Sequence, residues 1–182
     1  MWKWIKIVVG SLVGLLVLAV AILAVIGSRP DANRMHSSIT IRQRPETVWP
    51  WLYEPRRLKQ WVSWLVEVKH ADDEPPVPGK ESVWVMEDRN NNNALMQIVS
   101  RVASVQPAQS LSVDLSSAGA FHGHASYALT DLGDGQTRLE SESRYIFDNW
   151  FARFMTPVVL VFAKQKATGD LAHLRELVEA GR

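Results

Sequence analysis

Two histidines stand two residues apart in the second half of the chain, and two glutamates follow on what we predict to be the neighbouring strand. Residues at i and i+2 of a strand project from one face, so His122 and His124 are expected to lie together. Glu140 and Glu142 are then expected across from them. Two imidazoles and a carboxylate are ligands that bind zinc. The same alternation places both histidines opposite Tyr127, on the predicted outer face of the sheet. We therefore interpret them as surface residues and predict no metal site.

General acid–base chemistry in an apolar interior needs titratable side chains that point inward. Tyr127 and Tyr145 are the best candidates, and Arg144 or Glu140 would join them only if a bulge reversed the strand. A phenol at the mouth of an apolar wall needs no catalysis to explain it. The sequence has no Gly-x-Ser-x-Gly motif, phosphate-binding loop or dinucleotide fingerprint, so we predict no cofactor. The catalytic residues are unknown, and this absence favours a binding protein over an enzyme without deciding between them.

The composition excludes several functional classes. The net charge of the 182-residue chain is +1, so no overall field attracts nucleic acid, and we predict no nucleic-acid partner. The chain has no cysteine, which excludes disulfides, thiolate metal ligands and a cysteine nucleophile. Eight tryptophans are many for this length, and indoles suit thick cores and the walls of apolar pockets.

The amino-terminal segment contains an uncharged run of 20 residues, Ile7 to Ile26. As a helix the run would be about 30 Å long, the thickness of a bilayer's hydrocarbon core. A cleaved signal peptide is the alternative, but its apolar part is usually about 7 to 15 residues long. We therefore predict a transmembrane anchor at residues 1–28, a linker at 29–34 and one domain at 35–182, in a single-pass protein of the bacterial inner membrane.

The side of the membrane that carries the domain stays open. Lys3 and Lys6 precede the run, while Arg29 and Arg34 follow it, so the count of positive charges is divided. Gly10 and Gly14 form one GxxxG pattern, which would allow a homodimer through close helix contact. The alternative is that glycine is simply frequent in membrane helices.

The remaining sequence predicts strands followed by one long helix. HSSITIRQ alternates as a strand, and two short helices follow, each opened by a proline, in PETVWPWL and EPRRLKQW. About six more strands come next, and Gly133-Asp134-Gly135 between two alternating runs indicates a hairpin. A helical tract covers residues 150–180. The order predicts an α+β fold in which an antiparallel sheet of about seven strands curls around the last helix.

Three segments carry a resemblance to a known family: ITIRQRPETVWPWLYEPRRLKQW, GAFHGHASYALTDLGDGQTRLESES and LAHLRELVEA. The chain resembles the START-like, or SRPBCC, superfamily, which includes the polyketide cyclase/dehydrase and lipid-transport group, and within it the membrane-tethered bacterial members. The resemblance covers residues 35–180 and implies the helix-grip fold. The superfamily contains binders, carriers, cyclases and hydrolases, so the fold does not determine the activity.

The resemblance implies a cavity between the sheet and the last helix that holds an apolar ligand. The family's pattern contributes Trp61, the tryptophan that ends its short helix, and strand alternation and helical spacing select the other eleven candidate lining residues. Gly169 is one of them, because a glycine costs a helix about 1 kcal/mol and close approach by a strand or a ligand would explain it. A solid core built from the same residues stays open as the alternative. The candidates are Trp61, Trp84, Met86, Met96, Ile98, Phe121, Tyr127, Tyr145, Phe154, Val158, Phe162 and Gly169.

The first half of the last helix, residues 150–163, is apolar almost all round. Such a helix is either buried on most sides or in contact with lipid, and Pro157 should kink it or mark its true start. One hypothesis is a lip that contacts the membrane and admits a lipid to the cavity through Phe151 and Phe154. The alternative is the hydrophobic half of a core helix.

Three functions fit these patterns. The first is a membrane-anchored binder or carrier of a lipid, quinone or other apolar small molecule. The second is an enzyme of the polyketide cyclase/dehydrase kind. The third is a non-enzymatic regulatory domain that acts on a membrane partner. The anchor favours the first and third, since a soluble polyketide gives no reason for a tether. We take the first as the prediction.

Overall fold

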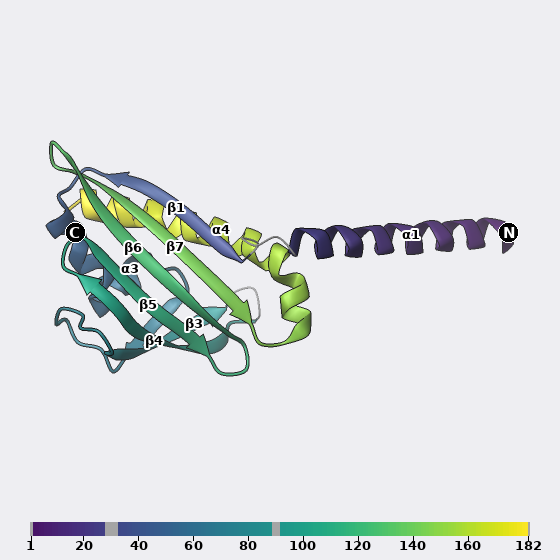
Figure 1. The fold of residues 1–182 in the computed structure, drawn as a ribbon, viewed down its shortest axis with the longest axis horizontal. Helices are drawn as coiled ribbons and strands as arrows, with labels where there is room; N and C mark the ends of the chain where they lie inside the picture. The colour runs from purple at the N-terminus through teal and green to yellow at the C-terminus, as the bar shows by residue number, and fades with distance from the viewer. Residues whose placement is uncertain (1, 28–32, 89–91, 182) are drawn as a thin grey trace.

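The computed structural model describes residues 2–27, 33–88 and 92–181. Seven strands form one antiparallel sheet in the order β1-β7-β6-β5-β4-β3-β2 (Figure 1). This confirms the predicted α+β class with a curled sheet and a long last helix. The strands are β1 Arg34–Ile41, β2 Leu65–Lys69, β3 Glu81–Asp88, β4 Ala94–Gln106, β5 Ser110–Ser117, β6 Phe121–Gly133 and β7 Gln136–Phe147.

Two short helical segments connect β1 to β2. They are α2 (Pro45–Val48), which continues into the 3-10 helix η1 (Trp49–Leu52), and α3 (Pro55–Trp61). Each α-helix begins with a proline that follows an extended residue, as the fixed φ of proline favours. The indole nitrogen of Trp61 donates a hydrogen bond of 2.9 Å to the main-chain oxygen of Trp51, which ties α3 to η1.

The long helix α4 (Trp150–Glu179) lies along the concave face of the sheet in its second half. Leu171, Leu174 and Val178 are buried there, as are Ile41 and Leu139 of the sheet, and together they belong to the main core. Asn149 caps the start of the helix, and its side chain accepts a 2.6 Å hydrogen bond from the amide of Ala152.

The first half of α4 projects beyond the sheet. Trp150 is 79% exposed and Phe151 is 58% exposed. Pro157 stands inside the helix, and Figure 1 shows the helix changing direction in this half before it runs along the sheet. The loss of one main-chain hydrogen bond and the clash of the ring explain such a bend. The part of α4 that packs into the core therefore starts later than residue 150.

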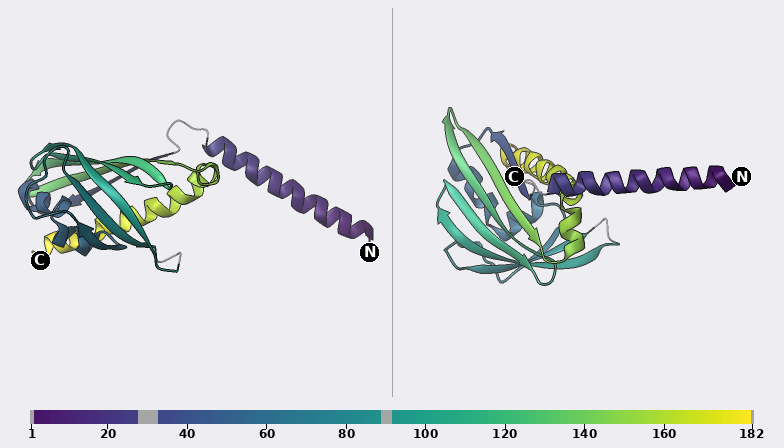
Figure 2. Two further views of the ribbon diagram at one scale, coloured as in Figure 1. Left: turned by 90° about the horizontal axis from the view of Figure 1, so that it is seen from below. Right: turned by 45° about the vertical axis from the view of Figure 1, so that its right-hand side comes forward.

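An amino-terminal helix, α1 (Trp2–Gly27), extends away from the domain in both views of Figure 2 and contacts α4. Across the described parts of the chain, no helix combines the length and apolarity that a membrane span needs. The anchor therefore stays a prediction. So does the homodimer, and a Cβ at Gly10 or Gly14 would meet nothing within 4 Å. Residues 29–32 of the predicted linker lie outside the described residues.

Candidate functional site

A large open cleft lies between α3 and α4, and we call it the α3–α4 cleft. Its volume is about 1190 Å³. Its apolar wall comes from the end of α3, the start of β2 and the middle of α4, and its rim is polar. The apolar lining residues are Trp61, Val62, Trp64, Leu65, Val159, Phe162 and Ala163. The polar ones are Lys59, Gln60, Ser63, Asp88, Gln165, Lys166, Asp170 and His173, and Gly169 completes the lining.

The buried indole of Trp61 separates the cleft from the interior of the domain. Only 4% of the residue is exposed, and its one polar atom already donates to Trp51. Its ring meets the ring of Tyr127 edge-on, with centroids 6.5 Å apart and planes at 87°. This geometry is favourable for two aromatic rings. Tyr127 therefore lies directly behind the wall of the cleft.

A buried carboxylate joins the two walls. Asp170 of α4 is 8% exposed, and its Oδ1 accepts a hydrogen bond of 3.2 Å from the amide of Ser63. Its Oδ2 accepts a second bond of 2.6 Å from Nζ of Lys166, one helical turn earlier. The carboxylate is thus satisfied by a cation and a main-chain donor, as a buried charge requires. Sequence reasoning missed Asp170, although an acid between the apolar positions of a core helix was a visible signal.

Trp64 has a left-handed backbone, with φ of 74°. This conformation is rare for a bulky residue and costs on the order of 1–3 kcal/mol, so its surroundings must hold it. Nζ of Lys166 lies 5.5 Å from the centre of the Trp64 ring, within the range of a cation–π contact. The main-chain oxygen of Trp64 also accepts a 2.8 Å hydrogen bond from the amide of Glu87. Lys166 and the strand β3 therefore fix this wall of the cleft.

Two tyrosines, Tyr127 and Tyr145, lie on the inner face of the sheet. The ring of Tyr145 meets that of Phe121 edge-on at 5.5 Å, and it crosses over Gly123 of the neighbouring strand. A Cβ at Gly123 would lie 2.6 Å from Cδ1 of Tyr145 and 2.5 Å from the main-chain oxygen of Arg144. Only glycine leaves room for the ring there. The absent side chain at position 123 is therefore what sets the position of Tyr145.

All three tyrosines of the chain should stay neutral at ordinary pH. Burial is the largest cause that raises the pKa of Tyr53, Tyr127 and Tyr145, and the charge of Asp170 adds to it at Tyr127. A hydrogen bond with Ser143 partly offsets the effect at Tyr145.

Alkaline titration should show this directly. An unfolded tyrosine ionises near pH ~10, so the native chain should develop less phenolate absorbance than the urea-unfolded chain at the same pH. Because the folded pKa values are raised, the stability that these neutral phenols contribute is complete below about pH 10. It is lost as the pH rises from there through the folded values. Coincident native and unfolded titration curves would contradict the burial of these rings.

The twelve candidate lining residues fall into separate places. Trp61, Phe162 and Gly169 line the α3–α4 cleft, and Trp84 lines a second pocket described below. Met86, Ile98 and Phe121 are buried in the core, and Met96, Tyr127 and Tyr145 pack against it. Phe154 and Val158 are half-buried on the first half of α4. Their joint role in one cavity stays a prediction.

One explanation offered for Gly169, close approach by a strand, is wrong. A Cβ at this position would meet nothing within 4 Å, so no strand approaches it closely. The residue instead opens onto the α3–α4 cleft. Approach by a ligand, the other explanation, stays a prediction.

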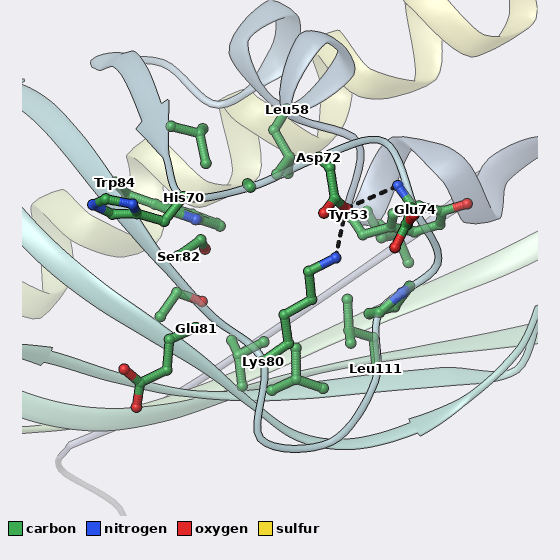
Figure 3. A pocket seen from close by; sticks show the side chains of 17 residues that line it. Tyr53, Leu58, His70, Asp72, Glu74, Lys80, Glu81, Ser82, Trp84 and Leu111 are labelled. Atoms are coloured by element: carbon green, nitrogen blue, oxygen red, sulfur yellow. Dashed lines mark hydrogen bonds and ion pairs between the residues drawn. The ribbon is translucent and has the colours of Figure 1, made fainter.

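The second pocket lies between η1, α3 and the sheet, and Figure 3 shows it from close by. Its volume is about 60 Å³, enough for a few water molecules. Nζ of Lys80 bonds Oδ1 of Asp72 at 2.5 Å, and the amide of Glu74 donates to the same oxygen at 3.0 Å. The hydrogen bond from Lys80 lowers the pKa of Asp72. This pocket is too small for the ligands considered above.

The two histidines lie on the outer face of the sheet, as exposed residues. Nδ1 of His122 is 3.2 Å from Oδ1 of Asp148, and Nδ1 of His124 is 2.8 Å from Oδ1 of Asp114. Glu142 instead pairs with Arg34 at 2.7 Å. Over the part of the chain that the structure covers, no group of three or more histidines and carboxylates is arranged to hold a metal ion.

A seven-stranded antiparallel sheet curled against a long carboxy-terminal helix is the helix-grip architecture, here with a cleft beside the helix. The family model described as polyketide cyclase / dehydrase and lipid transport matches residues 33–179, and the chain belongs to that family. No curated protein is detectably similar to the chain in sequence.

Solved structures share the fold at low sequence identity. CV1439 from Chromobacterium violaceum is 16% identical, with a TM-score of 0.64 over 81% of this chain and 97% of that one. NE0264 from Nitrosomonas europaea is 14% identical, with a TM-score of 0.64 over 85% of this chain and 99% of that one. DynU16, from the dynemicin biosynthetic locus, is 16% identical, with a TM-score of 0.60 over 82% of this chain and 48% of that one.

Proposed function

We propose that the chain is a membrane-anchored binding or carrier domain for an apolar small molecule such as a lipid or a quinone. The observation that carries the proposal is the α3–α4 cleft. Ligand sites in proteins are mostly apolar, with a few polar groups, and typically measure about 300–1,000 Å³. The cleft, at about 1190 Å³, is large enough for such a molecule. Two indoles and Phe162 supply the apolar wall, while Asp170 and Lys166 stand at its edge.

The titratable groups near the cleft favour binding over catalysis. Burial raises the pKa of Tyr127, so the phenol stays protonated and is a poor general base. Asp170, the buried carboxylate, already accepts two hydrogen bonds that hold the protein together.

A cyclase or dehydrase is the second candidate function. The family description names that chemistry, and DynU16 comes from a biosynthetic locus. The two candidates differ in what the protein releases, because an enzyme converts its substrate and a carrier returns it unchanged. A regulatory domain, the third candidate, should instead co-purify with a protein partner.

The deciding experiment is extraction and mass spectrometry of what the purified full-length chain retains. A carrier should hold about one equivalent of an apolar compound above the background of the membrane or detergent. The background is set by the Gly169→Phe variant, whose side chain projects into the cleft. A retained amount equal to that background would reject the carrier function and direct attention to the other candidates.

The membrane part of the proposal rests on the uncharged run Ile7 to Ile26 and on the exposed first half of α4. Asn33, where the described domain begins, accepts hydrogen bonds from the amide of Tyr145 and from Nε of Arg144, near the end of β7. The chain then enters α4 at Trp150. The exposed Trp150 and Phe151 therefore lie at the end of the domain from which the tether departs. Aromatic side chains at that level suit a membrane interface.

A single labelled cysteine can test this contact, because the chain has no native cysteine. An environment-sensitive dye on Phe151→Cys should shift to the blue in full-length protein reconstituted into vesicles, and lipid-borne quenchers should reduce its emission. The same dye on Thr130→Cys, an exposed position on β6, should stay in water. Equal emission and equal quenching at both positions would show that the first half of α4 does not touch the bilayer.

A further inference from the structure

The lining of the α3–α4 cleft changes from apolar to polar along the axis of α4. Val159, Phe162 and Ala163 line it first, and the lining residues of α4 that follow are polar apart from Gly169. His173 is the last residue of α4 in the lining. At 1.5 Å per helical residue, Val159 and His173 lie about 21 Å apart along the helix. The cleft therefore has an apolar end and a polar end.

The opposite wall of the cleft has the same order of apolar and polar residues. The ring of Trp64 contacts Lys166, and the amide of Ser63 bonds Asp170, one turn further along α4. The segment after α3 therefore runs antiparallel to α4, and residues that precede Ser63 lie toward the carboxy-terminal end of α4. This order places Lys59, which lines the cleft from the last turn of α3, toward the polar end.

Two lysines line the cleft, and they differ in their partners. Nζ of Lys166 lies 2.6 Å from Oδ2 of Asp170. Lys59 is exposed, and among the described residues no carboxylate oxygen lies within 4.0 Å of its Nζ. The two carboxylates in the lining are both engaged, Asp170 with Lys166 and Asp88 with a partner other than Lys59. Lys59 is therefore the cation that is available to an anion in the cleft.

His173 adds a hydrogen-bond donor at the polar end. Its Nδ1 lies 3.7 Å from Oε2 of Glu176, which does not line the cleft and is 71% exposed. That distance is longer than a hydrogen bond, so the hydrogen of the neutral ring is free to lie on Nε2. The polar end thus offers an incoming group one cation and one N–H donor.

We propose that the α3–α4 cleft binds an anionic amphiphile, an apolar chain that ends in a carboxylate or a phosphate. The chain lies against Phe162 and Trp64 at the apolar end, and the acidic head group lies at Lys59 and His173. A hydrogen bond between an ammonium and an acid is stronger than one between neutral groups, so this class is preferred over a neutral ligand of the same shape. The assignment rests on the proposed binding function and names the head group of its ligand.

The test compares probes that share one chain and differ in the head group: dodecanoate, 1-dodecanol and dodecylammonium. The full-length chain is held in phosphatidylcholine nanodiscs, empty nanodiscs give the background, and affinity is expressed against the concentration of probe in the bilayer. Dodecanoate should bind about tenfold more tightly than 1-dodecanol, and dodecylammonium most weakly. Dodecyl phosphate is measured alongside, and whichever acid binds more tightly identifies the head group as a carboxylate or a phosphate.

Lysine variants then locate the head group. Lys59→Met removes the charge but keeps an apolar stem, so dodecanoate should bind about tenfold more weakly while the affinity for 1-dodecanol stays the same. Lys59→Arg keeps the charge and should keep the affinity for dodecanoate. The matched control is Lys164→Met, which removes the same charge from an exposed position of α4 outside the cleft lining. It should bind all the probes as the native protein does.

The opposite results separate failure of the head-group assignment from failure of the proposed function. If dodecanoate and 1-dodecanol bind equally and Gly169→Phe weakens both, the cleft is a binding site but does not select an acid. Equal binding of dodecanoate by Lys59→Met and Lys164→Met would likewise overturn the assignment, because the acid would then not lie at Lys59. If no probe binds above the empty nanodiscs, the assignment and the proposed binding function both fail.

Discussion

Replacing Gly169 with phenylalanine is expected to weaken ligand binding in the α3–α4 cleft without unfolding the domain. A side chain at this position would begin in open space, because a Cβ there meets nothing within 4 Å. The new ring would occupy the cleft that Trp61, Trp64 and Phe162 line. Phenylalanine is also a better helix residue than glycine, so α4 should not be weakened. We expect at least a tenfold loss of affinity for any ligand that fills the cleft.

Two control variants separate the loss of space from the change of backbone. Gly169→Ala adds one methyl group and should raise the stability by about 0.5–1 kcal/mol while leaving binding nearly unchanged. Thr168→Phe adds the same ring to an exposed neighbour that does not line the cleft. It should bind ligand as the native protein does. Equal binding by Gly169→Phe and Thr168→Phe would show that the ligand site lies elsewhere.

The sequence predicted the fold in detail because its signals are local. Alternation along β6 and β7 correctly put Tyr127 and Tyr145 inside and His122 and His124 outside, and the Gly133-Asp134-Gly135 turn joins those two strands. A strand has only two faces, so a pattern of period two decides the direction of every side chain. The same holds for the buried positions Leu171, Leu174 and Val178 of α4.

The site was less predictable because it depends on contacts between distant segments. Nothing local in the sequence indicates that Asp170 receives the amide of Ser63, which is 107 positions away. Nor does any local rule place Trp64 in a left-handed conformation, since glycine or asparagine is the usual residue there. Periodicity selected inward residues from the whole sheet, whereas the open space lies at one side of the sheet, between α3 and α4. The sequence pattern determines which face of the sheet a side chain lies on. The open spaces between packed helices and strands depend instead on side-chain volumes in three dimensions.

The hydrogen bonds of Asp170 to Ser63 and Lys166 lead to a second large expected effect, on stability. Asp170→Ala should lower the free energy of unfolding by about 2–3 kcal/mol, because it leaves the amide of Ser63 and the ammonium of Lys166 without their acceptor. Lys166 is partly exposed and can turn to water, which keeps the loss below that of a fully buried pair. Asp170→Asn should lose roughly half as much, since the amide oxygen can still accept from Ser63 but carries no charge for Lys166.

Urea unfolding of the full-length chain measures this loss, with Glu176→Ala as the matched control. Glu176 lies on the same helix, is exposed and pairs with His173 at 3.7 Å, so its removal should change stability by less than about 0.5 kcal/mol. Hydrogen exchange at the amide of Ser63 should speed up in Asp170→Ala and not in Glu176→Ala. Because Trp64 needs its neighbours to hold a strained backbone, the cleft wall should loosen and ligand affinity should fall as well. Equal stability of the two alanine variants would show that the buried carboxylate does not hold α4 to the turn after α3.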